Sequence, residues 1–61
     1  MMTITKSTMT YMGYGTKRFA VEGTDLNKED LEDHFLHEGP FGTSARVYNN
    51  GTTAEVTCYY D

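Results

Sequence analysis

The chain is poor in the features that usually stabilise a very small domain. Its 61 residues include one cysteine, Cys58, so no intrachain disulfide can form and a cysteine-based zinc site would be short of ligands. A chain of this length buries only about 60% of the surface that its unfolded form exposes, so its stability is marginal. We expect a single domain over residues 1–61 that depends on a compact core, self-association or a bound partner.

Long apolar segments are missing as well. No run of about 18 apolar residues is available to cross a bilayer, and residues 1–15 do not contain the apolar core of a signal peptide. A lone cysteine is typical of reducing compartments, because small secreted domains are usually rich in disulfides. We therefore expect a cytoplasmic protein that does not bind a membrane.

Basic residues are scarce, and the acidic residues are concentrated in one segment. The net charge at pH 7 is −4, from nine acidic and five basic side chains. Seven of the acidic residues lie within residues 22–38, where Lys28 is the only base, so this segment carries −6 and the remaining residues carry +2. Binding to nucleic acid requires clustered lysine and arginine to neutralise phosphates. We expect no direct contact with nucleic acid and favour a basic protein or nucleoprotein partner.

The most regular pattern is VYNNGTTAEVTCYY at residues 47–60. Asn50 and Gly51 are the preferred pair for a type I′ turn, whose two central residues need positive φ. This turn predicts a β-hairpin in which Asn49 faces Thr52, with further pairs continuing outward along both strands.

The same register sorts the side chains of this hairpin onto two faces. One face is apolar and carries Ala45, Val47, Ala54, Val56 and Cys58, extended by Phe41 and Tyr60. On the other face Arg46 is directly opposite Glu55, a cross-strand pair worth about 0.2 to 1 kcal/mol, and Tyr48 and Tyr59 lie beside them.

Residues 28–38 are predicted to form an amphipathic helix. Asn27 is a good N-cap, Gly39 suits the left-handed position after a helix, and a proline follows it. Leu31 and Phe35 are one turn apart and form the side that would be buried.

The N-terminal half predicts a second hairpin. Residues 16–23 alternate between apolar and polar side chains, and residues 3–12 have β propensity with a break near residues 6–8 that fits a bulge or a ragged edge strand. Residues 13–15, Gly-Tyr-Gly, supply the turn. The expected fold is α+β: a ββαββ chain that forms an antiparallel sheet of two hairpins with one helix packed on one face. The predicted core face of the sheet consists of Ile4 or Met9, Phe19, Val21, Ala45, Val47, Ala54 and Val56.

Catalytic and metal-binding residue types are few. His34 and His37 each have an aspartate four residues earlier, a spacing that can place two ligands on one ion, but a metal site needs three or four ligands. Cys58 falls on the inward face and is interpreted as a packed core residue rather than a nucleophile. We therefore expect no metal, no cofactor and no catalytic residues, and hence a protein that is not an enzyme.

The outward side of the predicted helix is acidic. Leu36 falls within this acidic arc, where it is either an apolar anchor for a partner or a residue tucked under a tightened last turn. The exposed tyrosines of the second hairpin are further candidate anchors. The predicted binding residues are Asp25, Glu29, Asp30, Glu32, Asp33, Leu36, Tyr48 and Tyr59.

In size, acidity, threonine and tyrosine content, and lack of a catalytic constellation, the chain resembles the small accessory proteins with which bacteriophages inhibit host machinery, anti-CRISPR proteins among them. The resemblance implies a non-catalytic inhibitor in the host cytoplasm that binds stoichiometrically, often through an acidic surface placed in the nucleic-acid channel of its target. The alternative is a structural or regulatory homodimer that pairs through its sheet face or an edge strand.

Overall fold

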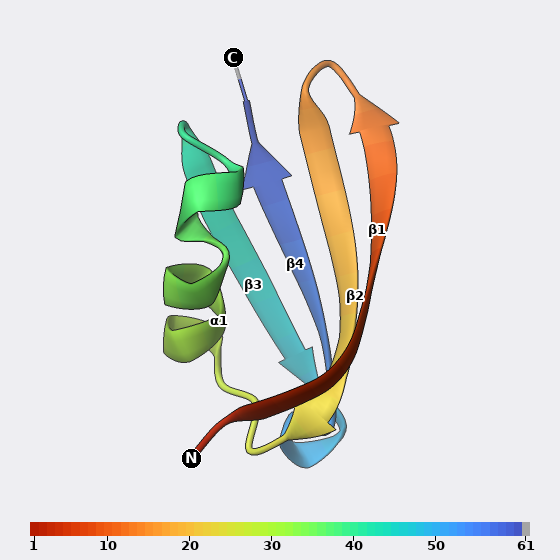
Figure 1. Cartoon of the computed structure of the whole chain (residues 1–61), viewed down its shortest axis with the longest axis vertical. Coiled ribbons are helices and arrows are strands. Elements are labelled where there is room, and N and C mark those ends of the chain that lie inside the picture. Colours follow the sequence, from red (N-terminus) through yellow and green to blue (C-terminus); the bar gives the residue numbers. More distant parts are fainter. Residues whose placement is uncertain (61) are drawn as a thin grey trace.

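Two hairpins form one antiparallel sheet, and a short helix packs on one of its faces (Figure 1). The computed structural model describes residues 1–60. The elements in chain order are β1 (Thr3–Gly13), β2 (Thr16–Thr24), α1 (Lys28–His34), a 3₁₀ turn (Leu36–Glu38), β3 (Gly42–Tyr48), a second 3₁₀ turn (Asn49–Gly51) and β4 (Thr53–Tyr59). The predicted α+β class and the ββαββ order are confirmed.

The strand order in the sheet is β1-β2-β4-β3. The two hairpins therefore meet where β2 pairs with β4, and β1 and β3 form the two edges (Figure 1). The helix lies over β3 at one edge, whereas β1 forms the opposite edge without a helix above it.

The predicted register of the second hairpin is confirmed from Tyr48–Thr53 through to Thr43–Cys58. The turn is wider than the predicted two-residue type. Asn50 and Gly51 have the positive φ values of 55° and 87° that a type I′ turn needs, but Asn49 also has a positive φ of 50°, so it is no longer part of the strand.

The wider turn docks onto the loop that leads to the helix. Gly51 O accepts a hydrogen bond from Leu26 N at 2.8 Å, and Thr52 O accepts one from Gly23 N at 3.0 Å. Gly51 is buried, and a Cβ on it would lie 2.9 Å from the carbonyl oxygen of Leu26. These contacts with a segment remote in sequence give the turn its extra residues.

The first hairpin also follows the predicted pattern. Val21 is buried and Phe19 partly buried on the helix side, while the alternating residues Arg18, Ala20 and Glu22 are exposed. The irregularity predicted near residues 6–8 is displaced, because these residues pair regularly with β2 and the two bulges lie between Ile4 and Lys6 and between Tyr11 and Gly13.

The α-helix is shorter than the predicted span of residues 28–38, since it ends at His34. The chain leaves the helical conformation at Phe35, whose φ is −97° and ψ is 7°, and the Phe35 carbonyl oxygen accepts hydrogen bonds from three other donors. Thr43 Oγ1 donates to it at 3.5 Å, Cys58 Sγ at 3.8 Å and the Glu38 N–H at 2.9 Å. The Glu38 bond begins the 3₁₀ turn that replaces the last helical turn.

Gly39 does not take the predicted left-handed conformation, because its φ is −138°. It is required for a different reason. The chain passes so close to β4 that a Cβ at this position would lie 2.8 Å from Cys58 Cβ and from Tyr59 N. The glycine therefore allows the backbone after the helix to pack against the sheet.

The core lies between the helix and the strands beneath it. Its buried side chains are Val21, Leu26, Leu31, Phe35, Ala45, Ala54, Val56 and Cys58, with Met2, Ile4, Phe19, Val47 and Tyr60 partly buried against them. Of the predicted alternatives Ile4 and Met9, Ile4 packs against the core and Met9 is exposed, and the prediction that Phe41 extends the apolar face is wrong because Phe41 is exposed. One helix is about 10 Å across and covers about two strands spaced about 4.8 Å apart, so Met9 on β1 lies beyond it.

Two leucines of the helical segment offer a matched test of this packing. Leu31 is 0% exposed and Leu36 is 59% exposed. Leu31→Ala should lower the free energy of unfolding by about 2 to 5 kcal/mol, because it leaves a cavity in the core. Leu36→Ala removes the same atoms from the surface and should change it by less than about 0.5 kcal/mol. Urea unfolding followed by circular dichroism measures both, and equal effects would contradict this packing.

Candidate functional site

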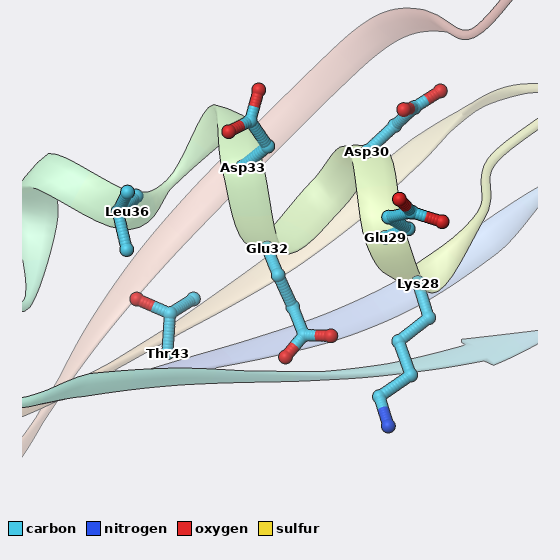
Figure 2. Close-up of a pocket in the computed structure, with 7 residues that line it drawn as sticks. All are labelled: Lys28, Glu29, Asp30, Glu32, Asp33, Leu36 and Thr43. Atoms are coloured by element: carbon cyan, nitrogen blue, oxygen red, sulfur yellow. The ribbon is translucent and has the colours of Figure 1, made fainter.

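Four carboxylates lie together along the outer side of α1, and we call them the acidic helix face: Glu29, Asp30, Glu32 and Asp33. They line a shallow depression between the helix and the edge of the sheet (Figure 2). Lys28, Leu36 and Thr43 complete its lining.

The position of this face is set by the cap and by the buried side of the helix. Asn27 Oδ1 accepts a hydrogen bond from Asp30 N at 2.8 Å, and Asn27 Nδ2 donates one to Asp30 Oδ2 at 2.8 Å. This reciprocal pair fixes the first turn and confirms the predicted N-cap. Leu31, fully buried, holds the opposite side of the same turn on the sheet. The acidic helix face is therefore mounted on a fixed support.

The carboxylates of the face point in two directions. Asp30 and Asp33 point away from the sheet, whereas Glu32 extends toward β3, as does Lys28 (Figure 2). No ion pair within 4.0 Å in residues 1–60 involves any carboxylate of the acidic helix face. Apart from Asp30, which also serves the cap, these carboxylates form no ion pair or side-chain hydrogen bond with the other described residues.

Leu36 lies at the end of this depression, above Thr43 (Figure 2). The sequence left two interpretations of this residue, an exposed anchor or a side chain tucked under the last turn. Its exposed fraction of 59% agrees with the first. The helix becomes a 3₁₀ turn at this point, but Leu36 stays exposed beside the carboxylates.

The other predicted binding residues lie elsewhere on the molecule. Asp25 is exposed in the loop before the helix, with a positive φ of 54°. Tyr48 and Tyr59 are each 44% exposed and lie on the sheet face opposite the helix. The structure therefore brings five predicted residues together in one depression and places the two tyrosines on a separate surface.

The open sheet face, on the side away from the helix, carries a second and smaller depression. It is lined by Met12, Thr16, Arg18, Ser44, Arg46, Glu55, Thr57 and Tyr59. Arg46 is opposite Glu55 as predicted, but the ion pair of Glu55 is with Arg18, whose Nε lies 3.5 Å from Glu55 Oε1. The sequence missed this pair because β2 and β4 become neighbours only in the folded sheet.

Cys58 is fully buried, in agreement with its interpretation as a core residue. Burial raises the pKa of its thiol above the ordinary value of 9.0, and the hydrogen bond from Thr43 opposes that rise. A protonated, enclosed thiol is a poor nucleophile.

Within residues 1–60, no group of three or more histidine, cysteine or acidic side chains is arranged to hold a metal ion. Across these residues there is also no helix with the length and apolar character needed to span a membrane. Comparisons with protein-family models, characterised proteins and solved structures find no match for this chain.

The burial of the Cys58 thiol predicts that the free energy of unfolding falls at alkaline pH. Because the folded-state pKa is raised, the contribution of Cys58 is complete below about pH 9.0 and is lost as the pH rises through the folded-state value. The stability difference between the natural chain and Cys58→Ala should therefore shrink as the pH is raised from about 8 to about 10. Urea unfolding at each pH measures it, and a constant difference would contradict the burial of this thiol.

Proposed function

We propose that this protein is a non-catalytic inhibitor that binds a basic surface of a host protein complex through its acidic helix face. The observation that carries the proposal is the group of carboxylates left without intramolecular ion pairs beside an exposed leucine, Leu36. In a folded chain with five basic residues, most of the negative charge on this surface remains available to a partner.

Each part of the depression has a role in such a contact. The carboxylates steer the encounter with a basic partner and select against acidic ones. Leu36 supplies an apolar anchor that is surrounded by charged side chains. This arrangement matches a small interface with a buried apolar centre and a polar rim. The Asn27–Asp30 cap keeps the helix in its bound shape before binding, and this lowers the entropy lost on association.

The proposed target is a site that normally binds nucleic acid. Such sites present clustered lysine and arginine to phosphates, and a rigid row of carboxylates offers those cations an alternative set of anionic partners. Inhibition then requires only that one chain of this protein occupies each nucleic-acid-binding site of the target. The chain's resemblance to phage inhibitors suggests CRISPR effector complexes as the first targets to examine.

Charge reversal tests the proposed surface. Purified CRISPR effector complexes are titrated with the chain, and guide-directed DNA binding is followed by electrophoretic mobility. We expect stoichiometric loss of DNA binding. Replacing Glu29 and Asp33 together by lysine should weaken inhibition by about 100-fold, because attraction becomes repulsion. Asp30 is left unchanged because it serves the helix cap.

A matched control separates this surface from net charge alone. Replacing Glu22 alone by lysine makes the same change in net charge as replacing Glu29 alone, but on the opposite side of the sheet, and inhibition should be nearly retained. Equal loss in these two single variants would show that only total charge matters. Unchanged DNA binding across all the complexes tested would contradict the proposed target class.

Salt provides an independent test of the electrostatic contribution. The Debye length falls from about 10 Å at 0.1 M to about 3 Å at 1 M salt, so attraction between the acidic helix face and a basic target should weaken steeply over this range. Affinity measured by titration calorimetry should therefore drop strongly with salt for the natural chain and much less for the variant with lysine at residues 29 and 33. Parallel slopes would contradict binding through this face.

A further inference from the structure

The edge strand β1 is unusual because neither of its faces is covered. Every residue from Thr5 to Met12 is exposed, although each lies in a strand paired with β2. Between the two bulges, residues 6–11 pair regularly with β2. A regular edge of this kind presents a row of unpaired backbone groups to any strand that can align with it.

The hydrogen-bonding pattern identifies which backbone groups face outward. Gly23 N donates to Thr52 O at 3.0 Å, so Gly23 is directed toward the β4 side of β2. Alternation along the strand then directs Glu22 toward β1, in agreement with the bond from Thr5 Oγ1 to Glu22 O at 3.1 Å. The residues of β1 that pair with Glu22, Ala20 and Arg18 therefore direct their backbone N–H and C=O groups toward β2. Those that direct their N–H and C=O groups outward are Ser7, Met9 and Tyr11.

The other edge of the sheet is protected. Lys28 and Glu32 extend from α1 toward β3, and charged side chains over an edge discourage strand addition (Figure 2). Thr43 of β3 also bonds to the helix segment through Phe35 O. By contrast, β1 has no helix above it (Figure 1) and carries a single charge, Lys6.

We propose that β1 pairs antiparallel with β1 of a second copy of this chain, with the two-fold axis at Met9, so that two four-stranded sheets become one continuous sheet. In this register Met9 pairs with the partner's Met9, and Ser7 pairs with the partner's Tyr11. All three outward-facing residues of each copy are then hydrogen-bonded, and each pair exchanges both of its N–H···O bonds.

The side chains agree with this register on both faces. Thr8 lies opposite the partner's Thr10, a favourable cross-strand pair on the open sheet face. On the helix side the two Met9 side chains meet next to Phe19, which extends the apolar surface of each copy across the junction. Lys6 lies opposite the partner's Met12, so no like charges face each other.

The distribution of charge favours a second copy as the occupant of this edge. The acidic helix face lies over β3, at the opposite edge from β1 (Figure 1), so association through β1 keeps the most acidic surfaces of the two copies far apart. Dimerisation is independent of the proposed target. If both proposals hold, the dimer presents two acidic helix faces at the ends of one sheet and binds a two-site target with avidity.

Sedimentation of the isolated chain tests the dimer without any target. The natural chain should sediment with twice the mass of one chain at micromolar or higher concentration. Met9→Pro removes an outward N–H without breaking the β1–β2 ladder, and should raise the dimer dissociation constant by at least about 100-fold. Met9→Thr keeps the N–H and should stay within about tenfold of the natural value. Circular dichroism confirms that both variants are folded.

Amide hydrogen exchange of the natural chain gives a test that needs no variant. In a monomer the amides of residues 6, 8 and 10 are protected and those of residues 7, 9 and 11 exchange freely. In the dimer, protection at residues 7, 9 and 11 should rise by more than about tenfold with protein concentration. A natural chain that stays monomeric at millimolar concentration would overturn the proposal, as would a folded Met9→Pro variant that dimerises like the natural chain.

Discussion

The packing of one short helix side on the small residues of the sheet is the contact on which the structure depends. Leu31 and Phe35 belong to one buried cluster with Ala45 and Val56 of the sheet. Fully burying a leucine or phenylalanine side chain contributes about 1.5 to 3 kcal/mol, a large share of the stability of a chain this small. Phe35 also stacks on Phe19 with 4.7 Å between ring centroids, which links the helix to the first hairpin.

This single contact decides where the polar residues of the chain are displayed. With the apolar side of α1 on the sheet, the carboxylates of the acidic helix face are kept out of the core and line the depression beside β3. Because one helix covers about two strands, β1 is left with both faces in solvent. The open sheet face is left with a mixed charge, including the Arg18–Glu55 ion pair. The protein therefore has one strongly acidic edge and one nearly uncharged, hydrogen-bonding edge.

Local chemistry made much of this fold predictable. Asn50 and Gly51 set the register of the second hairpin, and Asn27 set the start of the helix, because each acts on residues a few positions away. Contacts between residues that are far apart in the sequence could not be predicted from such local patterns. The carbonyl of Phe35, the residue at which the helix ends, accepts hydrogen bonds from Thr43 and Cys58, and these residues reach it only in the folded sheet.

The candidate site was likewise predictable where it depends on residues close in sequence, and not where it depends on contacts between distant residues. Helical periodicity was enough to group the acidic residues with Leu36, because they are close together in the sequence. It could not place Tyr48 and Tyr59 relative to them, since this depends on which sheet face the helix covers. It also could not show that β1 is the bare edge, since strand order follows from the nonlocal pairing of β2 with β4.

Nuclear Overhauser contacts in solution test the central packing most directly. The account predicts strong contacts between the ring protons of Phe19 and Phe35, and between the methyl groups of Leu31 and the core side of the sheet, with none from the sheet to Asp33. Contacts from the sheet to the carboxylate-bearing side of the helix, with Phe35 exposed to solvent, would contradict it.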